Sequence, residues 1–301
     1  MKIAITNVHL DLGAGRRGTD MGPSAIHVAG LIPCLKKLGH SIVNVDSIGS
    51  PSYEALDPID PNARFLPEIL RCCATLQQRV ASNVAAGNFP LVLGGDHAQA
   101  IGTVSGIMKY YRQHQKRIGV IWVDAHTDAN TPDSTPSGNI HGMPVATLLG
   151  HGHPDLVALN PDGYSIEPDD IVIIGARDID STELPLVKEL GIRVYTMSEI
   201  DKRGAAVCFQ EAIEKVNEGT DGLHLSFDLD GVDPKVAPGV GTPVLGGLSL
   251  RESHLLCELV CATQRLVSME MVELNPTLDH QNQTGRLAVW LIQSALGKTI
   301  L

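Results

Sequence analysis

IGVIWVDAHTD, residues 118–128, runs from an apolar stretch directly into a series of metal-ligand side chains. Residues Ile118 to Val123 predict a strand that is buried on both faces, because near-continuous Val and Ile are typical of parallel sheets. Two other segments have the same design: Leu91 to Leu93 precedes GGDH, and Leu223 to Phe227 precedes DLD. Ligands of open α/β folds bind beyond the carboxyl ends of the strands, so we expect these three segments to converge on one site.

Strand-like and helix-like segments alternate along the chain. The expected strands are Ile3–Val8, Ser41–Val45, Leu91–Leu93, Ile118–Val123, Ile171–Ile174, Arg193–Tyr195, Leu223–Phe227 and Leu266–Glu273. The expected helices are Ser24–Leu38, broken at Pro33, then Pro67–Ala86, a helix through Ile101 and Met108, Glu183–Leu190, Ala205–Val216, a helix that starts with a capping box at Ser249 and Glu252, and Thr284–Leu296. This alternation predicts a single α/β domain with a parallel sheet of about eight strands and helices on both faces.

Two long segments fit neither a strand nor a helix. Asn130 to Pro144 and Gly231 to Leu248 are rich in Gly, Pro, Ser and Thr. Loops of this length in a compact domain are usually functional, so we expect both of them to have a functional role.

Composition narrows the possible partners and the compartment. The formal net charge is −11, which argues against nucleic acid, because nucleic-acid binding needs a basic face. No apolar run is long enough to cross a membrane, and the N-terminal MKIAITNVHLDLG predicts a first strand rather than a signal peptide. The six cysteines form no Cys-x-x-Cys pair and are expected to be buried thiols. We therefore expect a cytoplasmic protein.

The residues after the three strands predict a metal site. In an extended backbone Asp124, His126 and Asp128 would share one face, and Asp228 and Asp230 would join them from another strand. Four clustered carboxylates repel one another unless cations are present, and two divalent ions would balance their charge. Oxygen ligands with two imidazoles and no thiolate favour Mn²⁺ over structural zinc, with Co²⁺ or Fe²⁺ as alternatives. Such a pair of ions predicts metal-assisted hydrolysis.

The three motifs GGDH (94–97), DAHTD (124–128) and SFDLDGVDP (226–234) resemble the signature motifs of the ureohydrolase family, which includes arginases and agmatinases. The resemblance extends over nearly the whole chain. Further segments are similar to bacterial arginases in particular: RRGTDMGPSAI (16–26), SGNIHGMP (137–144), GTPVLGGLSLRES (241–253) and VELNPTLD (272–279). It implies that residues 1–301 form one arginase-like catalytic domain, a three-layer sandwich. The implied activity is the manganese-dependent hydrolysis of L-arginine to L-ornithine and urea by a hydroxide that bridges two metal ions.

The resemblance also implies the metal ligands. One manganese would be held by His97, Asp124, Asp128 and Asp228, and the other by Asp124, His126, Asp228 and Asp230. Asp124 and Asp228 would then bridge the two ions. One departure from the family pattern is Ala98, which follows His97 where the family often has Ser.

Catalytic and substrate-binding residues are implied in the same way. Asp128 would move a proton to the leaving amine, His141 would carry protons between the site and solvent, and Glu273 would face the guanidinium. The expected substrate contacts are Asn130, Thr135 and Ser137 for the α-carboxylate, Asp180 supported by Glu183 for the α-amine, and Thr242. These polar residues favour arginine over agmatine, which lacks the carboxylate.

Three alternative functions also fit parts of the sequence, and the family resemblance predicts an oligomeric state. The nearest alternative is an agmatinase or another enzyme acting on a guanidino compound. A dinuclear phosphoesterase should contain an Asn-His pair and later His ligands, which Gly150-His151-Gly152-His153 imitates only weakly. A non-catalytic binding protein should lack a ligand, yet all six ligand positions are filled. The family resemblance further implies a homo-oligomer, either a trimer or a hexamer.

Overall fold

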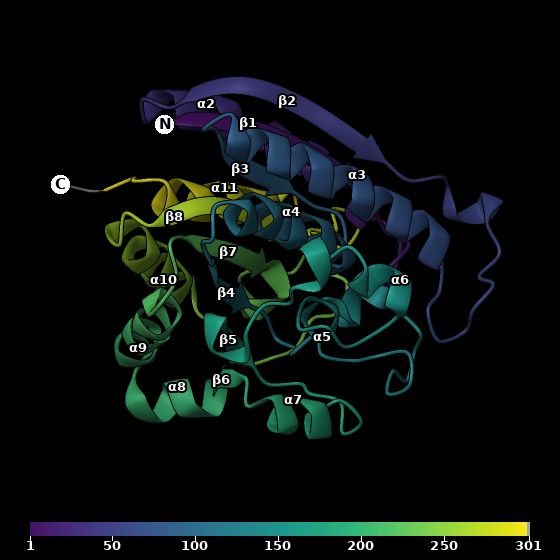
Figure 1. Cartoon of the computed structure of the whole chain (residues 1–301). Helices are drawn as coiled ribbons and strands as arrows, with labels where there is room; N and C mark the ends of the chain where they lie inside the picture. The colour runs from purple at the N-terminus through teal and green to yellow at the C-terminus, as the bar shows by residue number, and fades with distance from the viewer. Residues whose placement is uncertain (300–301) are drawn as a thin grey trace.

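The computed structural model describes residues 1–299, and an eight-stranded sheet runs through them (Figure 1). Its strand order is β2-β1-β3-β8-β7-β4-β5-β6, and all neighbouring strands are parallel. The strands are β1 (Lys2–His9), β2 (Ser41–Gly49), β3 (Phe89–Leu93), β4 (Gly119–Val123), β5 (Ile171–Ala176), β6 (Arg193–Thr196), β7 (Leu223–Asp228) and β8 (Leu266–Val272). The expected parallel sheet of about eight strands is confirmed.

Helices cover both faces of this sheet. They are α1 (Gly22–Val28), α2 (Leu31–Lys37), α3 (Leu66–Ala85), α4 (Ala100–Gln113), α5 (Pro144–Leu148), α6 (Pro154–Val157), α7 (Leu184–Leu190), α8 (Met197–Arg203), α9 (Ala205–Asn217), α10 (Leu250–Ala262) and α11 (Gln283–Ala295). Figure 1 shows α3 and α4 on one side of the strands and α9 and α10 on the other. Within residues 1–299, no helix is both long and apolar enough to cross a membrane.

Two apolar cores hold the three layers together. In β4, Ile121 and Val123 pack into the core that contains α9, α10 and α11, whereas Val120 and Trp122 pack into the core that contains α3 and α4. Side chains of a strand point alternately to opposite faces, so a strand covered on both sides must be apolar at every position. All five residues of β4 are buried, as the sequence of this segment predicts.

The N-terminal helical segment differs from the prediction. We expected a helix from Ser24 to Leu38 with a break at Pro33, but the break lies at Gly30, between α1 and α2. Gly30 has a φ of 93°, a left-handed conformation that costs glycine little. Pro33 lies in the first turn of α2, where its missing N–H is not needed for an intrahelical hydrogen bond.

The bounds of three short helices were not predicted by the sequence patterns. The helix α8 begins at a cap in which the Thr196 side chain accepts a hydrogen bond from the Glu199 N–H. The helices α5 and α6 are one turn long, and they flank the loop that contains His151 and His153. Elements this short bury too few side chains to produce a clear helical period.

Candidate active site

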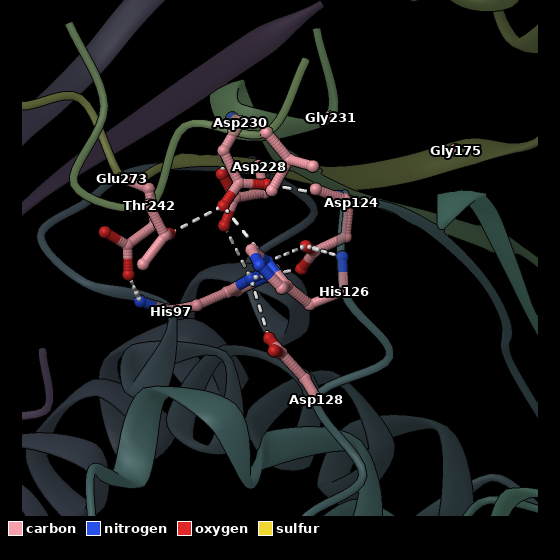
Figure 2. Close-up of polar contacts among 12 residues, drawn as sticks. His97, Asp124, His126, Asp128, Gly175, Asp228, Asp230, Gly231, Thr242 and Glu273 are labelled. Carbon is pink, nitrogen blue, oxygen red and sulfur yellow. Dashed lines mark hydrogen bonds and ion pairs between the residues drawn. The ribbon is translucent and has the colours of Figure 1, made fainter. Parts of the chain in front are cut away.

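Side chains from four adjacent strands meet at the carboxyl edge of the sheet (Figure 2). The strands β3, β8, β7 and β4 lie next to one another in that order at the centre of the sheet. Polar residues follow each strand at its carboxyl end, after two glycines in the case of β3. The resulting cluster consists of His97, Asp124, His126, Asp128, Asp228, Asp230 and Glu273. The predicted convergence of the three strand ends is therefore present, and β8 adds a fourth.

His97 is the centre of the first group of ligand atoms. Its Nδ1 atom lies 3.1 Å from a carboxylate oxygen of each of Asp124, Asp128 and Asp228. Although it is buried, Nδ1 makes no hydrogen bond to any residue in 1–299. The other ring nitrogen, Nε2, lies 2.9 Å from the Ser226 hydroxyl, which fixes the orientation of the ring. One imidazole nitrogen and three carboxylate oxygens thus converge in the manner of metal ligands rather than of a hydrogen-bonded pair.

His126 forms a second group that overlaps the first. Its Nδ1 lies 3.2 Å from Asp124 Oδ1 and 3.2 Å from Asp230 Oδ2. The ligand atoms of Asp124, His126 and Asp230 lie within 4.8 Å of one another, as do those of His97, Asp124 and Asp228. Asp124 directs Oδ2 to His97 and Oδ1 to His126, so it belongs to both groups. Asp228 belongs to the His97 group, and its expected second role, as a bridge to the His126 group, stays a prediction.

The backbone brings Asp124, His126 and Asp128 together by a turn and not by an extended strand. β4 ends at Val123, and the Asp124 carboxylate then accepts the His126 N–H at 2.7 Å. Asp128 has a φ of 48°, in the left-handed region that few non-glycine residues adopt. The expected extended alternation is therefore wrong, although its consequence, a shared site for these three side chains, holds. Strained backbone of this kind is commonly found at functional sites.

The electrostatics of the cluster fit bound cations. Burial, together with the charges of Asp124 and Asp230, raises the pKa of Asp228 well above its ordinary value. Burial also raises the pKa of Asp128 to about 7, with the Asp124 charge as the second cause. Burial opposes charge on Asp124 too, but the His126 and His97 imidazoles hold the pKa of Asp124 below its ordinary range. The four buried carboxylates disfavour one another's negative charge. Among the described residues, Asp128 Oδ2 also has no hydrogen-bond partner. Both features suit carboxylates that bind cations.

Glu273 connects the metal-ligand loop to His141. Its Oε1 atom accepts the His97 backbone N–H at 2.9 Å and lies 3.0 Å from His141 Nδ1. Burial lowers the pKa of His141, but the hydrogen bond and the charge of Glu273 outweigh it and raise that pKa to about 9. The His141 side chain keeps 18% of its surface exposed, so it can exchange protons with solvent.

Two adjoining cavities open beside the cluster. The smaller, of about 280 Å³, is bordered by every expected substrate contact, namely Asn130, Thr135, Ser137, Asp180, Glu183 and Thr242. The larger, of about 460 Å³, lies toward Arg16 and the segment Gly241–Val244. His126, His141 and Thr242 border both cavities, so the two are parts of one cleft that leads to the ligand cluster.

Hydrogen bonds hold the polar wall of the smaller cavity. Asn130 Nδ2 donates to Asp180 Oδ2 at 2.9 Å, and Glu183 accepts the backbone N–H groups of Asp180 and Ala129, each at 3.0 Å. Glu183 is only 2% exposed, and its hydrogen bond to the Asp180 N–H holds Asp180 in place. The Thr242 hydroxyl donates to Asp230 Oδ2 at 2.9 Å and thereby ties the long loop 231–248 to the cluster.

Sequence reasoning missed three residues that shape this site. Asp178 borders both cavities, and it lies in the GARDID segment that already contained Asp180. Trp122 stacks on the His97 ring with centroids 4.0 Å apart, and it donates its indole N–H to Asp124 Oδ2 at 3.0 Å. Arg177 lies behind the cluster and donates to backbone carbonyls. A basic residue directly after the buried strand β5 was the available signal for Arg177.

Comparison with known proteins agrees with this geometry. A family model described as "Arginase family" matches residues 1–297. The chain belongs to the arginase family. An arginase from Brevibacillus brevis is 48% identical over 301 residues, with 99% of each chain covered. An arginase from Bacillus caldovelox is 46% identical over 300 residues, again with 99% of each covered.

Solved structures of the arginase family have the same fold. The crystal structure of arginase from Bacillus subtilis has a TM-score of 0.91 to this chain at 46% identity, and the match covers 100% of this chain and 99% of that one. The native Bacillus caldovelox arginase structure has a TM-score of 0.92 at 46% identity, with 99% of each chain covered. The expected arginase-like architecture is therefore confirmed.

Proposed function

We propose that this protein hydrolyses L-arginine to L-ornithine and urea at a site that holds two Mn²⁺ ions. The observation that carries the proposal is the pair of overlapping ligand groups that share Asp124, at the base of a cleft with a polar wall. Relatives named arginase, at 46% and 48% identity over nearly their whole length, support arginine as the substrate.

The proposed ligand sets are those implied by the family resemblance; the two groups, His97 with Asp124 and Asp228, and Asp124 with His126 and Asp230, support them. His97, Asp124, Asp128 and Asp228 would hold one ion, and Asp124, His126, Asp228 and Asp230 the other. Oxygen-rich sets with one imidazole each suit Mn²⁺. When bound, such ions would supply positive charge and would lower the pKa of water, so that hydroxide for attack on a guanidinium carbon would be present near neutral pH.

The catalytic roles are those implied by the family resemblance, and the positions of the residues support them. Glu273, which is 1% exposed, presents a carboxylate beside His141 and the cleft, where it would face the cationic guanidinium. Asp128 borders the smaller cavity from within the cluster and would pass a proton to the leaving amine. His141 would exchange protons with solvent, because it borders both cavities and keeps part of its ring exposed.

The far end of the substrate would lie against the polar wall. Asn130, Thr135 and Ser137 offer an amide and two hydroxyls for an α-carboxylate, and Asp180 offers a carboxylate for an α-ammonium. Glu183 would act by supporting Asp180, and Thr242 would border the substrate from the opposite loop. Agmatine has no α-carboxylate, so this wall favours arginine.

The same proposal covers the setting of the enzyme. Residues 1–301 would act as one catalytic domain in a cytoplasmic homo-oligomer, a trimer or a hexamer. The described cysteines are all free thiols, which agrees with a reducing compartment.

Urea release from the Mn²⁺-loaded protein, with arginine and agmatine measured side by side, tests the proposal. Urea from arginine alone is the expected result. In the variant Asn130→Ala we expect the KM for arginine to rise while metal content stays at the wild-type level. Urea from agmatine in preference to arginine would favour the agmatinase alternative, and urea from neither would refute the proposed reaction.

A further inference from the structure

The Arg177 side chain makes an unusual number of hydrogen bonds to the backbone behind the ligand cluster. It follows β5 directly, and its guanidinium makes six hydrogen bonds in which main-chain carbonyls are the acceptors. Nε and Nη2 donate to Val244 O at 3.2 and 2.6 Å, Nη1 donates to the carbonyls of Gly175 and Gly231 at 3.2 Å each, and Nη2 also donates to Asp230 O at 2.7 Å and Val232 O at 3.5 Å. A single half-buried cation therefore joins three segments of the chain.

Two of these segments belong to the site. The carbonyl of Asp230 is part of a metal-ligand residue, and Val244 lies in the stretch Gly241–Val244 that borders the larger cavity. Between them, the Thr242 hydroxyl donates to Asp230 Oδ2. Figure 2 shows this contact between Thr242 and Asp230, with Gly231 beside Asp230.

The guanidinium is packed tightly against the loop that it holds. A Cβ atom added to Gly247 would lie 2.6 Å from Arg177 Nη2 and 2.7 Å from both the Asp233 nitrogen and the Val232 carbonyl carbon. The 231–248 loop thus has no room for a side chain at this point. All of the acceptors of Arg177 are main-chain carbonyls, so its guanidinium makes no hydrogen bond to the carboxylate of Asp230.

We propose that Arg177 is a positioning residue. Its hydrogen bonds hold the 231–248 loop against the segment that carries the metal-ligand residue Asp230, and these contacts set the width of the substrate cleft. This inference rests on the proposed arginine hydrolysis for its kinetic consequence. The planar guanidinium with five donors can reach carbonyls in several directions at once, whereas a lysine ammonium concentrates its donors at one point. Loss of the Arg177 hydrogen bonds would let Gly241–Val244 move away from the substrate without removing any metal ligand.

The test compares Arg177→Met and Arg177→Lys with the control Arg265→Met. Arg265 is also half-buried and also donates to a backbone carbonyl, that of Thr220, but it lies at the amino end of β8, away from the site. We expect amide hydrogen exchange within 231–248 to quicken by roughly tenfold or more in Arg177→Met. We expect the KM for arginine to rise by a similar factor with little change in kcat, as when ground-state and transition-state binding weaken equally. Arg177→Lys should lie between the wild type and Arg177→Met, and all variants should keep wild-type metal content.

Unchanged exchange and unchanged KM in Arg177→Met would overturn the proposal. A fall in kcat or in metal content with constant KM, matched in the control, would also overturn it, since that pattern denotes general destabilisation. If Arg177→Met does not fold, the same comparison with Arg177→Lys decides. A wild-type protein that releases no urea from arginine would refute the proposed function only, because hydrogen exchange in the 231–248 loop requires no turnover.

Discussion

Replacing Glu273 with Gln removes one negative charge from the contact that holds His141. Glu273 Oε1 lies 3.0 Å from His141 Nδ1 and also accepts the His97 N–H at 2.9 Å. A glutamine of the same length can still accept the backbone hydrogen bond from His97, but it attracts an imidazolium far less strongly. The substitution therefore tests the charge of Glu273 while leaving its shape in place.

The size of the effect follows from the pKa of His141. That pKa is raised from 6.5 to about 9, because the Glu273 contact and the charges of Asp128 and Asp96 outweigh the opposing effect of burial. A pKa difference of one corresponds to about 1.36 kcal/mol, so this raise represents about 3 kcal/mol of interaction. In Glu273→Gln we expect the His141 pKa to fall to about 6.5 or lower, because the interaction that most strongly opposes the pKa-lowering effect of burial is then lost.

The raised pKa of His141 also predicts how the free energy of unfolding depends on pH. A histidine whose pKa is raised by folding stabilises the fold fully below pH 6.5, and this contribution is lost as pH rises through about 9. The difference in the free energy of unfolding between wild type and Glu273→Gln should therefore be greatest below about pH 6.5 and should shrink above about pH 9.

Imidazole NMR titration of the metal-free protein measures this pKa directly. The His141 resonance can be assigned by its loss in His141→Asn, and that variant also serves as a control for the other histidines. A titration midpoint of His141 that is the same in wild type and in Glu273→Gln would refute the reasoning. The charge of Glu273, 3.0 Å away, would then have no effect on the pKa of His141.

Three further substitutions probe the ligands, their support and the fold. Asp228→Ala removes an oxygen 3.1 Å from His97 Nδ1 and should abolish tight metal binding and urea release together; two ions retained by elemental analysis, with full turnover, would exclude Asp228 as a ligand. Trp122→Phe keeps an aromatic ring against His97 but removes the indole hydrogen bond to a cluster carboxylate, so metal affinity measured by calorimetry should fall roughly 10- to 100-fold; an unchanged affinity would contradict this. Gly102→Ala places a Cβ 2.5 Å from the Cys73 carbonyl where α4 crosses α3, and should lower the free energy of unfolding by about 1–3 kcal/mol; an unaltered urea-denaturation midpoint would show that the helices can separate freely.

The sheet and the position of the site could be predicted because both depend on short-range patterns. Strands covered on both faces need continuous apolar runs, and IWV before Asp124 is such a run. Polar residues that directly follow these runs must lie at the carboxyl edge, whatever the order of the strands. The six substrate contacts named from the family resemblance all border one cavity for the same reason, since they come from the loops at that edge.

Features that depend on distant contacts could not be predicted in this way. The left-handed conformation of Asp128 and the turn after Val123 arise from the surrounding fold, and an extended backbone was the natural but wrong expectation. The contacts of Arg177 with Val244 join residues far apart in the chain, and no local spacing encodes them. The break at Gly30 shows a related limit, since proline is a poor marker of a helix end when it falls in the first turn.

The place of β8 in the sheet bears on how a newly synthesised chain acquires its shape. Within residues 1–299, β8 is the last strand in chain order, yet it lies between β3 and β7. Until Leu266–Val272 emerges from the ribosome, both neighbours present an unpaired edge, which is the kind of surface that promotes aggregation. His97, which follows β3, and Asp228, which ends β7, also remain on separate halves until then. We therefore expect the nascent chain to close its sheet and to gain its capacity for metal in one late step, with β8 as the closing strand.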